Sequence, residues 1–239
     1  MNYLDIFLLF ACYSCLGWIM ETIYASITHK KFVNRGFLNG FFCPIYGLGA
    51  VLIIVSSTWV GTIFSGALAA GIASIAVAVI LVTTLEYITG FMLEKVFHCK
   101  WWDYSEDFAN LHGYICLKYS LLWGVLALVL LEIVHPGIAG LVLFIPSEIK
   151  IALSALLFVY FLVDTIKSVA DTLDLRNAIL NHSSFSLLKY YEKILRYRRI
   201  FQAFPRLLIL NADIINRDVR SILNEKVDKL KTELKSKFQ

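Results

Sequence analysis

Carboxylates stand inside the long apolar runs of this sequence. Glu86 lies in LVTTLEYITGFMLEK, and a helix would place it roughly 12 Å, about two turns, from Glu94. Glu21 lies about two turns from the end of the first run, and Asp164 lies in the last part of the fifth. A charge at the centre of a membrane helix costs about 2.5–3.5 kcal/mol, so such residues usually mark a functional site. We take Glu21 and Glu86 as candidates for substrate or cation coordination or proton relay; the alternative is that tyrosine, threonine or basic partners hold them for packing.

Two polar, aromatic and glycine-bearing segments interrupt the apolar runs, at 34–49 (NRGFLNGFFCPIYGLG) and 101–120 (WWDYSEDFANLHGYICLKYS). The glycines of the first segment let its backbone turn sharply and expose N–H groups. With Arg35 nearby and Tyr46 opening a helix, this backbone could cradle a phosphate or a carboxylate; a tight turn anchored by Arg35 is the alternative. Irregular backbone at membrane depth must be buried in protein or line a wet cavity. We therefore expect the two segments to form one site at the cytoplasmic face.

The second segment places an acid among aromatic rings. A membrane-interface belt explains tryptophan alone, but it does not explain Asp103 beside Trp102, or the Asn110 and His112 that follow. These polar groups extend the candidate site. The full set of candidate binding residues is Glu21, Asn34, Arg35, Cys43, Tyr46, Glu86, Trp102, Asp103, Tyr104, Asn110 and His112.

The five cysteines do not form a metal or disulfide pattern. No CxxC lies in a loop, and Cys12 and Cys15 fall inside the first apolar run, where thiols usually pack. We expect reduced thiols, no metal and no other cofactor. A nucleophilic Cys43 or Cys116 beside His112 is an alternative that spacing alone does not test.

The composition indicates a membrane protein. Hydrophobic residues make up 59% and charged residues 17% of the 239 residues, and the mean hydropathy is +0.70. A soluble domain carries more charge than this, and long apolar runs indicate membrane helices. The runs predict an all-α polytopic bundle of about five membrane helices, with four or six as alternatives, and with re-entrant or interfacial segments.

The expected spans are about 4–28, 46–64, 67–97, 115–134 and 150–169. We expect His135-Pro136-Gly137 to end the fourth span and 138–145 to form a shallow re-entrant or interfacial piece, because it is too short to cross. The many small residues of 67–97 predict that this helix packs at the centre of the bundle.

Lysine and arginine placement predicts the orientation. With five spans and the C-terminus inside, only Lys150 of the 22 Lys and Arg residues lies outside. Basic residues concentrate on the cytoplasmic side of membrane proteins. We expect a multi-pass protein of a bacterial cell membrane, with its N-terminus outside and its C-terminus in the cytoplasm.

The composition changes at about residue 170, which divides a membrane domain (1–170) from a basic cytoplasmic helical tail (171–239). Residues 187–204 have the pattern of an amphipathic helix lying on an anionic lipid surface, and Pro205 ends it. This attachment explains the basic charge more simply than nucleic acid, which we do not expect as a partner. A second amphipathic helix could form a homodimer or pack on the first, through the stripe Ile215, Val219, Leu223, Val227, Leu230 and Leu234.

Several strings together resemble the bacterial family labelled putative ABC-transporter type IV, or CmpB-like permeases, over about residues 10–137. They are GW at 17–18 with Glu21, NRGFL at 34–38, CPIYG at 43–47, LEY at 85–87, EKVF at 94–97, WWDYS at 101–105, ICL at 115–117 and WG at 123–124. The resemblance implies a multi-pass permease. Phe41 stands where the family usually has proline, and Tyr114 where it usually has a basic residue; the second departure weakens anion binding by that connector.

These observations lead to a transporter permease subunit whose inward-facing site includes Glu21, Arg35 and Glu86. The sequence has no GxxxxGK[ST] motif, so an ABC-type permease would need a separate ATP-binding subunit. The alternative is a membrane-embedded enzyme acting on a lipid or isoprenoid-phosphate head group at the inner leaflet. Asp103, His112 and Glu86 would then supply acid–base groups and Arg35 would hold the phosphate. A scaffold whose tail recruits partners is a third hypothesis.

Overall fold

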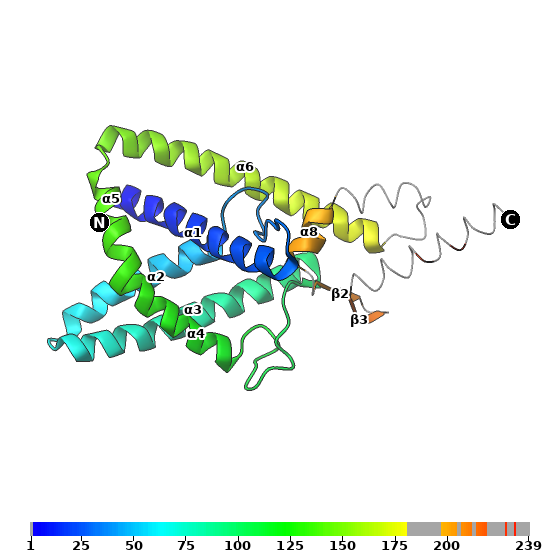
Figure 1. Cartoon of the computed structure of the whole chain (residues 1–239), viewed down its shortest axis with the longest axis horizontal. Helices are drawn as coiled ribbons and strands as arrows, with labels where there is room; N and C mark the ends of the chain where they lie inside the picture. The colour runs from blue at the N-terminus through cyan, green and yellow to red at the C-terminus, as the bar shows by residue number, and fades with distance from the viewer. Residues whose placement is uncertain are drawn as a thin grey trace.

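The computed structural model describes residues 2–180, 197–204, 207–211, 214–218, 228 and 232. The predicted all-α membrane bundle is confirmed, because five helices within this part are long and apolar enough to cross a bilayer. Figure 1 shows them side by side, with the described helix and strands of the tail at one end of the bundle. They are α1 (Tyr3–His29), α2 (Pro44–Ile63), α3 (Ala67–Phe97), a composite of α4 (Leu117–Val129), the π-helix η1 (Leu130–Val134) and α5 (His135–Phe144), and α6 (Ser147–Leu180).

The fourth span is longer than predicted, and the expected break at His135-Pro136-Gly137 is wrong. Pro136 has no N–H for the carbonyl four residues earlier, and its ring crowds that turn. The chain widens into η1 at this point and continues as α5 instead of ending. In hydrocarbon a helix satisfies its own backbone, so continuing is favoured over an exposed break. Residues 138–144 therefore complete the span, and the predicted shallow interfacial piece does not exist.

The expected central position of the third helix is also wrong. Only 17% of the apolar window of α3 is buried, against 39% for α1, so α1 is the more enclosed helix. Apart from Phe97 at its end, the buried residues of α3 recur every four positions on one stripe, and the other residues are half-buried or exposed. That stripe consists of Ser74, Ala78, Val82, Glu86 and Gly90.

Helices α1 and α2 pack through glycines at two points. Gly47 lies so close to α1 that an added Cβ would overlap Ser14 Oγ, and one at Gly17 would overlap the Tyr46 ring. The Cys43 N–H donates to the Ser14 carbonyl at 2.9 Å, at the point where α2 begins. This close approach fixes the depth of α2 against α1, and with it the place of Tyr46.

A small antiparallel sheet lies where the tail meets the bundle, in the order β1 (Cys99–Lys100), β2 (Leu208–Asn211) and β3 (Ile214–Asp218). The second amphipathic helix was predicted to include Ile215, and that part of the prediction is wrong. Ile214 and Ile215 are β-branched, and β3 pairs with β2, which pairs with β1. The remaining stripe residues, Val219 to Leu234, lie outside the described residues. The short helix α8 (Arg198–Ala203) falls within the predicted 187–204 helix, of which 187–196 are also outside.

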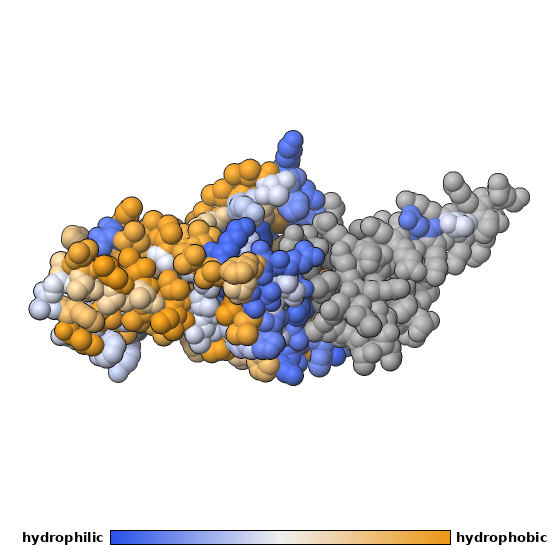
Figure 2. Space-filling model, turned by 90° about the horizontal axis from the view of Figure 1, so that it is seen from below, coloured by the Kyte–Doolittle hydropathy of each residue, from blue (hydrophilic) through white to orange (hydrophobic). Residues whose placement is uncertain are grey.

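Hydrophobic and hydrophilic residues gather on different parts of the surface (Figure 2). Figure 2 shows hydrophobic residues over the end of the bundle that carries the α2–α3 turn, and hydrophilic residues gathering toward the tail. Lys150, at the hydrophobic end, lies 2.5 Å from Asp5 of α1. This ion pair holds the start of α6 against the start of α1.

We expect Gly47→Ala to lower the free energy of unfolding by about 1–3 kcal/mol, because the methyl group must displace Ser14 and the Phe10 backbone. The measurement is thermal unfolding of the purified chain in detergent, followed by tryptophan fluorescence. Gly71→Ala on α3 is the matched control, since nothing lies within 4 Å of its added Cβ. A Gly47→Ala protein as stable as the control would contradict the packing described here.

Candidate functional site

The first polar cluster forms around Glu21 of α1. Its Oε1 accepts the Tyr46 hydroxyl proton in a hydrogen bond, and its Oε2 lies 3.2 Å from Arg35 Nε. The Arg35 guanidinium also lies 5.4 Å from the centre of the Tyr24 ring. Gly17, one turn earlier on α1, leaves the space that the Tyr46 ring fills. Glu21 therefore already has a cationic partner and a hydroxyl donor.

The second polar cluster forms around Glu86 of α3, which is 5% exposed. Trp123 Nε1 donates to Oε2 at 2.9 Å, and the Tyr104 hydroxyl donates to Oε1 at 3.3 Å. Burial, with the carboxylate beside it, raises the pKa of Tyr104, so this hydroxyl remains a donor at neutral pH. Within the described part of the chain no lysine or arginine pairs with Glu86. Both carboxylate oxygens thus receive neutral donors only.

The two clusters meet at one cavity of about 340 Å³ between α1, α2, α3 and the fourth span. The rings of Tyr46 and Trp123 lie edge to face with their centres 5.6 Å apart, and both rings line the cavity. Glu86 also lines it, whereas Glu21 and Arg35 reach it only through Tyr46. The rest of the wall is mostly apolar and includes Leu16, Met20, Ile45, Ile53, Val82 and Leu126.

The first polar segment is held against α6 by Asp164. Its Oδ1 accepts the Asn39 N–H at 3.1 Å and its Oδ2 accepts the Gly40 N–H at 2.9 Å. Ser168 Oγ, one turn further along α6, accepts the same Asn39 N–H at 3.0 Å. Gly40 leaves room for this contact, because an added Cβ would overlap the Tyr160 hydroxyl and crowd Asp164 Oδ2. The segment therefore does form an N–H cradle for an anion, and the anion in it is a carboxylate of the chain itself.

Asn34 and Cys43 shape this segment and do not face the cavity. Asn34 Oδ1 accepts from Trp18 Nε1 at 2.8 Å and from the Gly36 N–H at 3.1 Å, and its Nδ2 donates to the Asn39 carbonyl at 2.9 Å. Cys43 is buried, and this burial raises the pKa of its thiol to about 12. A thiol that is protonated at neutral pH is a poor nucleophile.

The acids and amides of the second segment fold that connector onto itself. Asp103 Oδ1 accepts from the Ser105 N–H at 3.1 Å and the Ser105 hydroxyl at 2.5 Å, and it lies 3.6 Å from Lys100 Nζ. Asn110 Nδ2 donates to the carbonyls of Ser105 and Asp107, both at 3.0 Å. Neither Asp103 nor Asn110 lines the cavity.

Trp102 and His112 also have local partners. Trp102 Nε1 donates to the Tyr114 carbonyl at 2.9 Å, and its ring packs over Gly90 of α3. His112 Nδ1 lies 3.1 Å from the Tyr87 hydroxyl. Of this segment's candidates, only Tyr104 contacts a cavity-lining acid.

Arg199 of α8, in the tail, hydrogen-bonds the backbone of the first segment. Its Nη1 donates to the carbonyls of Gly36 at 2.8 Å and Leu38 at 3.0 Å, and its Nη2 donates to that of Phe37 at 3.2 Å. Burial lowers the pKa of this guanidinium, but the group stays charged at neutral pH. Its hydrogen bonds to the three carbonyls replace those it would make to water. The segment is thus held on its N–H side by Asp164 and on its carbonyl side by Arg199.

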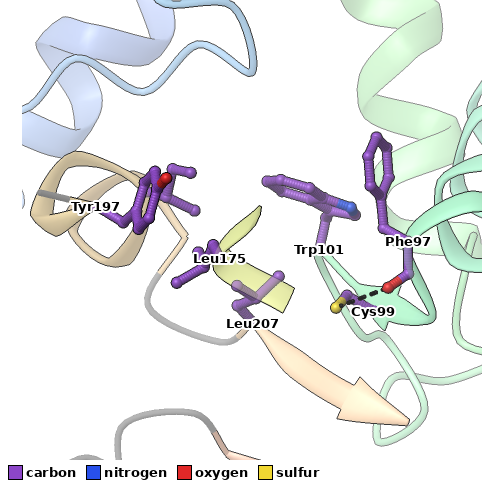
Figure 3. Close-up of a cluster of buried hydrophobic side chains, with 7 residues drawn as sticks. Phe97, Cys99, Trp101, Leu175, Tyr197 and Leu207 are labelled. Carbon is purple, nitrogen blue, oxygen red and sulfur yellow. Dashed lines mark hydrogen bonds between the residues drawn. The ribbon is translucent and has the colours of Figure 1, made fainter. Parts of the chain in front are cut away.

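A shared apolar core joins the tail to both connectors. Trp101 packs its ring against Phe204 of the tail, with centres 4.6 Å apart, and against Phe37 of the first segment at 5.2 Å. Figure 3 shows Trp101 between side chains of the α3 end and side chains of α6 and the tail. The buried members of this cluster are Phe97, Cys99, Trp101, Leu175, Tyr197, Ile200 and Leu207.

Sequence reasoning missed three residues that shape the site: Trp123, Ser168 and Arg199. Trp123 had a usable signal, because it is an indole donor in an apolar span that begins directly after a polar connector. Ser168 lies one turn after Asp164, which marks one polar face of α6. Arg199 had no signal, since its partners are carbonyls more than 160 positions away along the chain.

The fold and the site define a polytopic α-helical membrane protein with two carboxylate clusters at one intramembrane cavity. The model of the family described as "Putative ABC-transporter type IV" matches residues 8–169, which include both polar segments. The chain therefore belongs to this family. The comparisons with curated proteins and with solved structures gave no match.

We expect Arg199→Ala to speed amide hydrogen exchange at Asn39 and Gly40 roughly tenfold, because the segment loses its carbonyl-side clamp. Hydrogen-exchange mass spectrometry on the full chain in detergent measures this. Lys31→Ala is the matched control, since it removes one exposed positive charge from the same end of the bundle. Equal exchange in Arg199→Ala and in the control would show that the clamp does not stabilise the segment.

Proposed function

We propose that this chain is the membrane subunit of a transporter and that its cavity binds an amphiphilic cation. The observation that carries the proposal is the buried Glu86 carboxylate in an otherwise mostly apolar wall. Its hydrogen bonds come from neutral donors, and a cation in the cavity would supply the opposite charge. The apolar wall fits the hydrocarbon part of such a substrate.

The two acids have different roles in this proposal. Glu86 contacts the substrate directly, while Glu21 orients the Tyr46 ring that forms part of the wall. Arg35 neutralises Glu21, so Glu86 is the acid that remains available to a substrate cation. The family match and the five apolar helices support a membrane transporter component.

The proposed orientation places the N-terminus outside and the C-terminus in the cytoplasm of a bacterial cell membrane. Lys150 and Asp5 then form an ion pair at the outer end, while Arg35, Lys100 and Arg199 lie at the cytoplasmic end with the connectors. Basic residues at the inner side agree with the usual asymmetry of membrane proteins. The two connectors and the tail are then the surface available to a separate ATP-binding subunit. The family implies such a subunit, and the sequence has no GxxxxGK[ST] motif of its own.

No observation favours the alternative of an enzyme acting on a lipid or isoprenoid-phosphate head group. Its acid–base groups have separate partners: Asp103 bonds Ser105, and His112 bonds Tyr87. Arg35, which would hold the phosphate, is engaged by Glu21. The transporter proposal needs only the groups that already line or adjoin the cavity.

We expect the purified chain in lipid vesicles to bind radiolabelled tetraphenylphosphonium, a lipophilic cation, saturably. Glu86→Gln should weaken this binding about tenfold or more, because it removes the one charge at the cavity wall. Asp103→Asn is the matched control, since Asp103 lies outside the cavity lining. Equilibrium dialysis gives the dissociation constants; absence of saturable binding, or equal binding by Glu86→Gln and the native chain, would refute the cation proposal.

The orientation has its own test in reporter fusions expressed in a bacterium. A fluorescent protein fused after Gln239 should fluoresce and alkaline phosphatase fused there should be inactive, because both reporters would be cytoplasmic. Alkaline phosphatase inserted in the turn between α2 and α3 should be active. The reverse pattern would show the opposite orientation.

A further inference from the structure

One carboxylate of the membrane domain has no role in the cavity. Glu132 lies near the middle of the 28-residue fourth span, within the π-helix η1. The cavity-lining residues of this stretch are Val129, Leu130 and Val134, so Glu132 points to a different side, and it is exposed. Among the described residues it makes no hydrogen bond and no ion pair.

Placing the Glu132 carboxyl group here costs free energy, because hydrocarbon provides no hydrogen-bond donor or acceptor for it. Protonation removes the charge but leaves an O–H donor and a carbonyl acceptor unsatisfied. Lys118, at the start of the fourth span, is the one lysine or arginine of that span, about 21 Å away along the helix. His135, one turn after Glu132, makes no ion pair with it, and its Nδ1 lies 2.9 Å from the Tyr13 hydroxyl. The described residues thus leave the Glu132 carboxyl group free to pair outside this chain.

We propose that the exposed face of η1 and α5 around Glu132 is the contact surface with a second copy of this chain in the membrane. Two copies insert in the same orientation, so a two-fold axis along the membrane normal brings their Glu132 residues to the same depth. A carboxylic acid is both donor and acceptor, so two of them satisfy each other. A lysine or arginine partner would need a different protein, because no described lysine or arginine of this chain lies at this depth.

The backbone on this face permits the close approach that such a pair requires. Pro136 and Gly140 follow Glu132 at four-residue intervals, and all three are exposed. Nothing lies within 4 Å of an added Cβ at Gly140. Small residues at a membrane helix interface let two backbones come together. This surface is distinct from the C-terminal helix considered in the sequence analysis, and it does not depend on the function proposed for the cavity.

The test uses the full chain with a fluorescent tag after Gln239, in phosphatidylcholine–phosphatidylglycerol vesicles at low protein density. Single-molecule photobleaching should show two steps for most native particles. Glu132→Leu should raise the dimer dissociation constant roughly tenfold, and Glu132→Gln, whose amide is again donor and acceptor, should retain the dimer. Thermal unfolding of Glu132→Leu in detergent separates lost pairing from lost folding, because an unchanged unfolding temperature shows that the fold is retained.

Cysteine cross-linking locates the surface independently. Gly140→Cys should give a disulfide-linked dimer on oxidation, in excess of the native chain with its own five cysteines. Phe158→Cys, at a 60% exposed position on α6, is the matched control on another face. Single-step bleaching, a dimer insensitive to Glu132→Leu, or equal cross-linking at Gly140 and Phe158 would each overturn the proposal; the first would indicate a different membrane protein as the partner.

Discussion

The carboxylate of Asp164 holds two backbone N–H groups of the first polar segment, and the arrangement of the site depends on this contact. Asn39 and Gly40 lie at the edge of the apolar bundle, where an unpaired N–H costs about 1–3 kcal/mol. A single side chain from α6 satisfies both donors and turns the segment back toward the bundle. Pro44 then begins α2 directly after the turn, and Tyr46 meets Glu21 of α1.

A series of polar and aromatic side chains runs from this first segment into the bundle. Arg35 neutralises Glu21, Glu21 accepts from Tyr46, and the Tyr46 ring meets the Trp123 ring that bonds Glu86. The chain makes the two acids unequal, because one has a cationic partner and the other has neutral donors only. This asymmetry is the physical basis for the proposal that Glu86 binds the substrate.

The two connectors and the described part of the tail form one unit at the end of the bundle. Arg199 takes the carbonyls of the first segment, and Trp101 packs against both that segment and the tail. The family match ends at residue 169, so the groups that complete this unit come from beyond it. The tail therefore contacts both segments, the one that carries Arg35 and the one that carries Tyr104.

The sequence by itself determined the membrane class and the end of α3 at Phe97, and it favoured five spans over four or six, because hydrophobicity and helix length are local properties read over a window. It also singled out Glu21, Glu86, Arg35, Tyr46 and Tyr104, since polar residues in or beside apolar runs are rare. The course of the chain past Pro136 was not predictable, because a proline either ends a helix or is absorbed by a wider turn, and the surroundings decide between them.

Which polar groups meet was decided only by the tertiary structure. Spacing suggested an N–H cradle at 34–49, but the anion in it comes from Asp164 on a helix more than 120 positions away. Asp103, Asn110 and His112 were equally good candidates in the sequence, yet each is bonded within its own connector or to α3. Partner choice among polar groups depends on the depth and rotation of whole helices, and those follow from the packing of glycines and aromatic rings between distant segments.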